Sequence, residues 1–385
     1  MRRQVITAAG APSPMAHYSQ GILAGETLYA AGQIASDYKT GVAPEARQDP
    51  AFPYYGSEIQ KQARYVLENL RAVYREAGLE LADTVKAQVF LTDLNDFHYF
   101  DQVWKQFFPS PPPRTTVQVS GLLVPGCRIE IDLTAVKRAV EKRVVKGATT
   151  PTPLAHYTQG VVAGDTLYAA GQIASDYKTG VPAGPSLARQ TRYVLENIAS
   201  VYKAAGLELA DTVKAQVFVT EAKDLKAFDM VWKKFFPAAP PRTVVQVGAL
   251  LVPGCKIEID LIACAKGVKR KRVEGGMLAG ETLYCAAHSA PEARQDRAFP
   301  YYGSDIQKQA RAALENALKT YRAAGCAPQD TVKAQVFIAE LGDFFYFDQV
   351  WKEFFPSPPP RTTVQVSSLL APGCRVAFDL TAAKT

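Results

Sequence analysis

The sequence predicts an α+β protein built from three similar units, each with one β-sheet and two helices. One domain-sized pattern occurs three times along the 385 residues. Within each copy, segments with strand periodicity and segments with helix periodicity follow one another in the same order. The composition, 48% hydrophobic and 21% charged, is typical of a chain that buries a full core.

The repeat is visible as ordered sequence matches. LAGETLYAAGQIASDYKTGV returns as VAGDTLYAAGQIASDYKTGV and, shortened, as LAGETLYCAAHSA, at residues 23–42, 162–181 and 278–290. DTVKAQVF begins at Asp83, Asp211 and Asp330. The matches predict three units at residues 1–140, 141–268 and 269–385, the third with a shortened N-terminal strand region. Units of this length are domains rather than solenoid repeats.

Periodicity predicts the elements of the first unit. The expected order is strands at 2–6 and 22–35, the latter with a hairpin turn at 24–27, a helix at 57–78, a strand at 83–93, a helix at 96–109, and strands at 114–123 and 127–136. In the first helix, apolar residues recur at spacings of three and four, at Ile59, Ala63, Val66, Leu67, Leu70 and Val73. In the strand at 83–93, Val85, Ala87, Val89 and Leu91 alternate with polar residues and share one face.

Two helices cover only one face of such a sheet. The other face carries many apolar side chains and must pack against something. Three copies in one chain can pack these open faces on each other as a closed pseudo-threefold ring. We therefore expect an intramolecular pseudo-trimer and a monomeric chain.

Charge and cysteine usage exclude several classes of protein. The net charge of +7 is concentrated at 137–147 and 266–272, which we interpret as solvated junctions between units. Neither run is interleaved with aromatic residues, so a nucleic-acid partner is not expected. The six cysteines form no CxxC or Cys/His metal spacing. No apolar run approaches the ~20 residues of a membrane span, and no secretory signal is evident, which favours a cytoplasmic protein.

Arg114, Arg242 and Arg361 are candidate carboxylate-binding residues. Each follows a proline-rich turn and opens a strand, so its guanidinium starts from a fixed place. A planar guanidinium can bind a carboxylate through two hydrogen bonds. A surface salt bridge at a strand end is the alternative interpretation.

Glu130 and Glu258 stand in the motif RIEIDL or KIEIDL, where the isoleucines face one side and the glutamate the other. A glutamate near a bound carboxylate could orient or activate a water molecule, and a solvated strand face is the alternative. The third unit has Ala377 at this place. In the motif around Arg114, the arginine and Glu130 are expected to form the two ends of one small site on neighbouring strands.

Two further pairs of residues are candidates. Tyr18 and Tyr157, in AHYSQG and AHYTQG, could each close a pocket and donate a hydrogen bond, or could pack in the core. Gly32 and Gly171 lie inside strands, where a ligand that approaches the backbone or a bulge would explain them. The third unit lacks this tyrosine segment and has Ala287 in place of the glycine.

Five ordered motifs together resemble the Rid/YjgF family of reactive-intermediate (enamine/imine) deaminases: HYSQG, AGQIASDYKTG, DTVKAQVFLTDLNDF, PPRTTVQV and CRIEIDLTAV. The resemblance covers the first two units nearly completely and most of the third. It implies a chorismate-mutase-like α+β fold, a trimeric arrangement with ligand sites in the clefts between units, and no cofactor. This chain looks like such a trimer fused into one polypeptide.

The resemblance also assigns roles. It places the family's carboxylate-binding arginine on Arg114, Arg242 and Arg361, and its water-orienting glutamate on Glu130 and Glu258. Its pocket tyrosine falls on Tyr18 and Tyr157, and its pocket glycine on Gly32 and Gly171.

The pocket departs from the best-known deaminases at several positions. Their cysteine two residues after the arginine is replaced by Thr116, Val244 and Thr363. Their serine before the pocket glycine is Ala31 or Ala170, and an asparagine on the second helix is Asp101, Asp229 and Asp348. An additional aromatic loop at 46–56, with Phe52, Tyr54 and Tyr55, could line a cleft or fill a seam between units.

The function we expect is hydrolytic deamination of enamine or imine intermediates of small carboxylic acids, which releases 2-oxo acids and ammonia. Because the third unit keeps Arg361 but lacks the glutamate, tyrosine and glycine, at most two clefts should be competent. One alternative is another carboxylate-directed reaction in specialised biosynthesis on a chorismatase-like scaffold. A second is a non-catalytic ligand-binding or translation-inhibitor-type protein.

Overall fold

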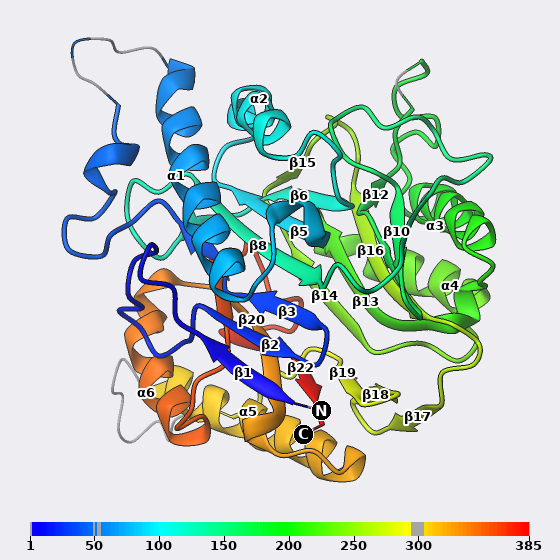
Figure 1. Cartoon of the computed structure of the whole chain (residues 1–385). Helices are drawn as coiled ribbons and strands as arrows, with labels where there is room; N and C mark the ends of the chain where they lie inside the picture. Colours follow the sequence, from blue (N-terminus) through cyan, green and yellow to red (C-terminus); the bar gives the residue numbers. More distant parts are fainter. Residues whose placement is uncertain (1, 49–50, 52–54, 177, 294–303, 385) are drawn as a thin grey trace.

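The computed structural model describes residues 2–48, 51, 55–176, 178–293 and 304–384 (Figure 1). The first unit contains β1 (Arg3–Ile6), β2 (Gly21–Ala24), β3 (Thr27–Ala30), β4 (Gln33–Ile34), α1 (Tyr55–Glu76), β5 (Thr84–Leu91), α2 (Phe97–Phe107), β6 (Arg114–Gln118), β7 (Gly121–Leu122) and β8 (Ile129–Val136). The expected element order is therefore present. The long segments at 22–35 and 114–123 are each divided into shorter strands.

The other two units repeat this order. The second has β9 (Lys142–Val145), β10 (Gly160–Ala163), β11 (Thr166–Ala169), β12 (Gln172–Ile173), α3 (Leu187–Ala204), β13 (Thr212–Val219), α4 (Leu225–Phe235), β14 (Arg242–Gln246), β15 (Ala249–Leu250) and β16 (Ile257–Cys264). The third has β17 (Arg270–Val273), β18 (Gly276–Ala279), β19 (Thr282–Cys285), α5 (Ser304–Ala324), β20 (Thr331–Ile338), α6 (Phe344–Phe354), β21 (Arg361–Gln365) and β22 (Val376–Ala383). The fold is α+β, as predicted. The boundaries near residues 140 and 268 stay a prediction.

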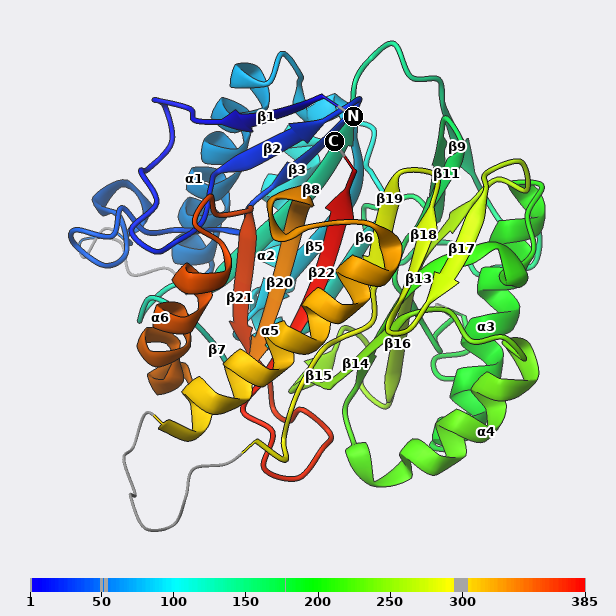
Figure 2. The same ribbon diagram turned by 90° about the horizontal axis from the view of Figure 1, so that it is seen from below.

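Each unit has one mixed sheet. In the first, the strands lie in the order β1-β2-β3-β8-β5-β6, with β5 and β6 parallel and the other neighbours antiparallel. The helices lie on the outside of the molecule and the sheets inside, which is clear in Figure 1 and Figure 2. The chain termini lie close together in both views, so the third unit closes against the first.

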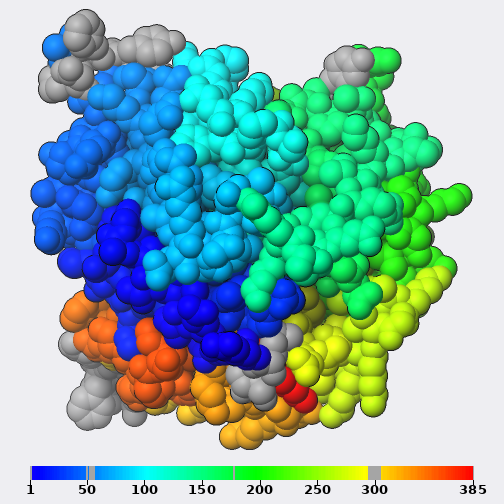
Figure 3. Space-filling view, in the orientation of Figure 1, coloured from blue at the N-terminus to red at the C-terminus, as the bar shows by residue number. Residues whose placement is uncertain are grey.

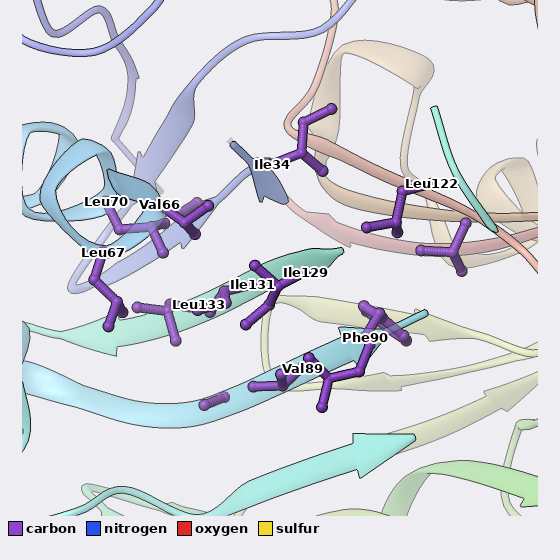
Figure 4. Packing of buried hydrophobic residues seen from close by; sticks show 14 of the residues in the cluster. Ile34, Val66, Leu67, Leu70, Val89, Phe90, Leu122, Ile129, Ile131 and Leu133 are labelled. Atoms are coloured by element: carbon purple, nitrogen blue, oxygen red, sulfur yellow. The ribbon is translucent and has the colours of Figure 1, made fainter. Parts of the chain in front are cut away.

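The helix-covered face of each sheet forms a hydrophobic core. In the first unit, Val66, Leu67 and Leu70 of α1 approach Ile131 and Leu133 of β8, and all five are fully buried (Figure 4). The three-and-four spacing read from the sequence is therefore the buried face of α1.

The basic runs are not simple solvated junctions. Residues 142–145 and 270–273 form β9 and β17, the edge strands that open the second and third sheets. Lysine and arginine suit an edge strand because their charge discourages pairing with another chain. The strands were not predicted, but Arg143, Lys271 and Arg272 are exposed, as expected of solvated junctions.

The segment at 114–123 also differs from its prediction as one strand. It breaks after Gln118, and the short β7 leaves its own sheet to pair with β21 of the third unit. Likewise β15 of the second unit pairs with β6 of the first, and a bridge joins Gln246 to Ser368. Each unit thus adds backbone hydrogen bonds to a neighbour, and the ring closes. Figure 2 shows β7 beside β21, and Figure 3 shows the three units as adjoining regions of the surface.

A polar network occupies the pseudo-threefold axis, where the open faces of the three sheets meet. Gln88 donates to Gln216, Gln216 to Gln335, and Gln335 to Gln88. Around this ring, a lysine of each unit pairs with a buried aspartate of another unit, in the pairs Lys86–Asp260, Lys214–Asp379 and Lys333–Asp132. Lys86 and Lys214 are buried, and Lys333 is partly buried. The expected intramolecular pseudo-trimer is present. Its units meet through buried apolar clusters, one at each interface, as well as through this polar network.

We expect Asp260→Asn to lower the free energy of unfolding by about 3–5 kcal/mol, because Lys86 would then be buried without an anionic partner. The matched control is Glu26→Gln, which removes an exposed pair with Lys137 and should cost less than about 1 kcal/mol. Urea denaturation followed by tryptophan fluorescence measures both. Equal losses in the two variants would contradict a stabilising role for the axial pairs.

Candidate functional site

A cleft of about 240 Å³ lies between the first and second units and is called the first cleft. The first unit contributes Arg114 and Thr116 from β6. The second unit contributes Tyr157, Gly171 and Glu258. Five residues predicted from the sequence therefore line one cleft, and they come from two units.

Arg114 and Glu130 do not share a site, so the prediction that they form two ends of one site was wrong. Within the first sheet, β5 lies between β6 and β8, which keeps the two residues apart. Glu130 instead accepts a hydrogen bond from the backbone amide of Thr363 and lies within electrostatic range of Arg361. These residues repeat the arrangement of the first cleft between the third unit and the first, and the place where they meet is called the second cleft.

The arginines of these clefts are buried and only partly satisfied. The side chains of Arg114 and Arg361 are 1% exposed and pair with Asp101 and Asp348, at 2.9 and 2.7 Å. Aromatic rings of α2 surround Arg114, with centroids 5.0 to 5.3 Å from its Cζ atom. Arg114 Nη1 and Arg361 Nη2 have no hydrogen-bond partner among the described residues. Each guanidinium therefore keeps donors for a ligand.

The glutamates are buried opposite these arginines. Glu258 accepts a hydrogen bond from the Thr116 backbone amide, and Oε2 of both Glu130 and Glu258 has no partner within the described structure. Burial, and then the charge of Asp132 or Asp260, raises the pKa of Glu130 and of Glu258 to about 8. A carboxyl group with a pKa near neutrality can both donate and accept a proton at pH 7.

The glycines are explained by these glutamates rather than by a ligand or a bulge. A Cβ atom on Gly171 would lie 2.1 Å from Glu258 Oε1 and 2.8 Å from Thr115 Oγ1. Gly32 meets Glu130 and Thr362 at the same distances. In the third unit Ala377 replaces the glutamate, which removes the clash and allows Ala287.

The sequence prediction missed the threonines that hold the cleft floor. Thr115 Oγ1 accepts from the Gly171 amide at 3.1 Å and donates to Asp260 at 2.6 Å. Thr362 makes the equivalent contacts with Gly32 and Asp132. The sequence offered one signal for these threonines, which is that each directly follows a predicted arginine. The floor of each cleft is thus connected to the axial network.

The second cleft contains a second tyrosine that the sequence did not single out. The hydroxyl groups of Tyr18 and Tyr38 are hydrogen bonded at 2.7 Å. Burial raises the pKa of Tyr18 to about 12 and that of Tyr38 well above its usual value. The negative charge of Glu130, when present, raises both pKa values further, by a smaller amount. Tyr38 has a left-handed backbone, with φ of 63°, in a turn held by Asp37 side-chain hydrogen bonds. Such a costly conformation in a non-glycine residue often marks a functional site.

The third cleft, between the second and third units, is different. Arg242 is 27% exposed and pairs with Asp229 at 2.9 Å. Ala377 stands where the other clefts have a glutamate, and the tyrosine-bearing segment is absent from the sequence. Of the predicted arginine, glutamate, tyrosine and glycine, this cleft therefore has the arginine alone.

Three further observations concern the site and the chain around it. The aromatic loop lies largely outside the described residues, which exclude 52–54 and give no side-chain position for Tyr55. Within the described residues, no group of three or more histidines, cysteines, aspartates or glutamates is placed to hold a metal ion. No helix among them is both long and apolar enough to cross a membrane.

Comparison with known proteins identifies the family. A family model described as Endoribonuclease L-PSP matches residues 8–137, 147–265 and 273–384. The chain belongs to this family. The resemblance to Rid/YjgF proteins that the motifs indicated is confirmed, and with it three copies of that fold in one chain.

Several single-unit relatives are similar to one part of the chain. A RutC family protein of Pyrococcus horikoshii is 39% identical over 35% of this chain and 98% of its own length. TdcF of Escherichia coli, named as a reactive intermediate deaminase, is 36% identical over 36% and 99%. The human 2-iminobutanoate/2-iminopropanoate deaminase is 33% identical over 35% and 90%. The crystal structure of Escherichia coli TdcF with bound serine is 34% identical, covers 35% of this chain and 98% of that one, and has a TM-score of 0.30.

We expect the double variant Glu130→Gln/Glu258→Gln to gain stability relative to the wild type as the pH rises. The unfolded glutamates ionise near their usual pKa of 4.5, whereas the folded ones keep their protons up to about 8. Their contribution to stability is therefore full below pH 4.5 and is lost as the pH rises to about 8. Glutamine stays neutral and avoids this loss.

Urea midpoints of the two proteins at pH 5 and pH 9 measure this difference. The Glu76→Gln variant, at an exposed position outside both clefts, is the control. A double variant whose advantage is the same at both pH values would show that these glutamates titrate normally.

Proposed function

We propose that the first and second clefts hydrolyse enamine or imine intermediates of small carboxylic acids to 2-oxo acids and ammonia. One observation carries this proposal. In the first cleft, an arginine with a free N–H donor and a protonatable glutamate with a free oxygen line the same small cavity, 240 Å³ in volume. The names of the TdcF and human relatives describe activities of this class.

The arginine would bind the substrate carboxylate. Its guanidinium is held by Asp101 on one side, so the remaining N–H groups point from a fixed position and little rotamer freedom is lost on binding. Fixing the carboxylate places the neighbouring imine carbon at a defined distance from the opposite wall. Arg361, held by Asp348, would do the same in the second cleft.

The glutamate would move the protons. With a pKa of about 8, Glu258 is largely protonated at pH 7 and can protonate the imine nitrogen, or the enamine carbon in an enamine substrate. The resulting carboxylate can accept a proton from the water molecule that attacks the imine carbon. Collapse of the carbinolamine then breaks the carbon–nitrogen bond, forms the carbonyl and releases ammonia. One water molecule is consumed and the glutamate ends in its starting state.

The tyrosine would orient the groups at the mouth of each cleft. Its high pKa keeps the hydroxyl protonated, so Tyr18 and Tyr157 remain hydrogen-bond donors at neutral pH. Thr116 supplies the amide that fixes Glu258, and its hydroxyl has no partner among the described residues. The third cleft lacks the glutamate, so we propose two competent clefts per chain.

We expect two double variants to separate the inter-unit sites. Arg114→Ala/Glu258→Gln removes two residues of the first cleft and should keep about half of the wild-type kcat per chain, because the second cleft is intact. Arg114→Ala/Glu130→Gln changes residues of one unit but damages both clefts, and should reduce kcat by about 10²-fold or more.

The assay couples the protein to threonine dehydratase and follows 2-oxobutanoate release, with Glu76→Gln as the control. No acceleration by the wild type would defeat the deaminase proposal. Equal activities of the two double variants would defeat the pairing of residues across units.

A further inference from the structure

The third cleft forms an open groove of about 480 Å³ that the proposed reaction does not use. Its lining includes Trp232, Lys233, Arg242, Arg272 and Gly275. Two features distinguish it from the corresponding regions of the other clefts. A segment that covers the equivalent tryptophan elsewhere is missing, and the charge is more positive.

The missing segment leaves a buried hydrogen-bond donor. In the first cleft, Trp104 Nε1 donates to the His156 carbonyl at 3.0 Å, and Trp351 Nε1 donates to the His17 carbonyl in the second. In the third unit, only Glu274 and Gly275 separate β17 from β18, so no such segment reaches Trp232. Trp232 is 1% exposed, and its Nε1 atom has no acceptor within the described structure. An unpaired buried donor costs about 1–3 kcal/mol, which an acceptor on a ligand could offset.

The charge of the groove comes from a substitution at one strand position. The strand registers place Arg272 of β17 where β1 has Val5 and β9 has Val144. Arg272 donates to the backbone carbonyls of Ala238 and Ala239, in the turn just before Arg242. This groove therefore contains the guanidinium of Arg272 in addition to that of Arg242, whose equivalents are present in the other two clefts.

The cations of this groove are less neutralised than their counterparts. Lys105 pairs with Asp101 at 3.1 Å in the first cleft and Lys352 with Asp348 at 3.2 Å in the second. Among the described residues, neither Lys233 nor Arg272 has a carboxylate within 4 Å, and Arg242 is paired with Asp229 alone. The groove thus has two uncompensated positive charges.

We propose that this groove is a non-hydrolytic binding site for a small dianion with two carboxylates. Arg242 binds one carboxylate with the N–H groups that Asp229 does not occupy, and Arg272 and Lys233 bind the other. The Trp232 N–H supplies a donor at the floor of the groove. The site retains ligand without converting it, because the third unit has Ala377 in place of the glutamate that moves protons in the proposed reaction. This assignment is independent of whether the other two clefts are deaminases.

Isothermal titration of the full chain with succinate at low salt tests the proposal. We expect binding at this groove to weaken about tenfold or more in Arg272→Val, which restores the valine of the other two units. Arg272 is exposed, so the substitution should not disturb folding. Arg75→Ala, which removes one exposed positive charge elsewhere, is the matched control and should leave succinate binding unchanged.

Two further titrations locate the site. The Arg114→Ala/Arg361→Ala variant should still bind one succinate per chain, and propionate should bind the groove at least tenfold more weakly than succinate. The proposal is overturned if the wild type does not bind succinate, or if Arg272→Val binds it as tightly as the wild type does. None of these measurements uses turnover, so a failed deaminase assay would not affect them.

Discussion

The contact on which the rest of the structure depends is the pairing of a buried lysine of one unit with a buried aspartate of another at the pseudo-threefold axis. Two buried charges are unfavourable unless they meet in good geometry with further hydrogen bonds. Asp260 satisfies this condition through Lys86, Gln88 and Thr115 of the first unit. These buried charges are therefore satisfied in only one relative position of the units.

That register also builds the clefts. Asp260 stands two residues after Glu258 on β16, and Thr115 follows Arg114 on β6. The hydrogen bond from Thr115 to Asp260 thus brings the arginine of one unit against the glutamate of the next. Assembly of the ring and construction of the site are one event, and a separate unit would have half of each cleft. Fusion of three units in one chain keeps the partners together and also lets one cleft diverge from the others.

The sequence was sufficient for the fold and for the kinds of residue at the site. The three-and-four spacing of α1 depends on local periodicity and is present. The alternation predicted for β5 is present at Ala87, Val89 and Leu91. Val85 differs, because it lies at a register shift and packs with Val161 and Tyr168 of the second unit. The sheet faces that the helices leave uncovered predicted that the three units pack as a ring, and this prediction is confirmed. The reason for Gly171 was not accessible, because the atom that excludes a side chain there belongs to Glu258, 87 residues away in the sequence.

The glutamate that faces each arginine could not be predicted either, because it comes from a neighbouring unit. Nothing local indicates that β7 and β15 leave their own sheets, or that β5 separates Arg114 from Glu130. Tyr38 was overlooked because its left-handed backbone and its contact with Tyr18 exist only in the folded turn. The basic run that includes Arg272 was interpreted as a junction, since a strand of four residues has too short a pattern to recognise.

A crystal structure of the protein with 2-oxobutanoate tests directly whether each site is shared between two units. We expect one ligand in the first cleft, with its carboxylate on Arg114 and its carbonyl carbon toward Glu258. A second ligand should lie between Arg361 and Glu130. A ligand that contacts Arg114 and Glu130 together, or one that avoids both arginines, would contradict the conclusion that each site is shared between two units.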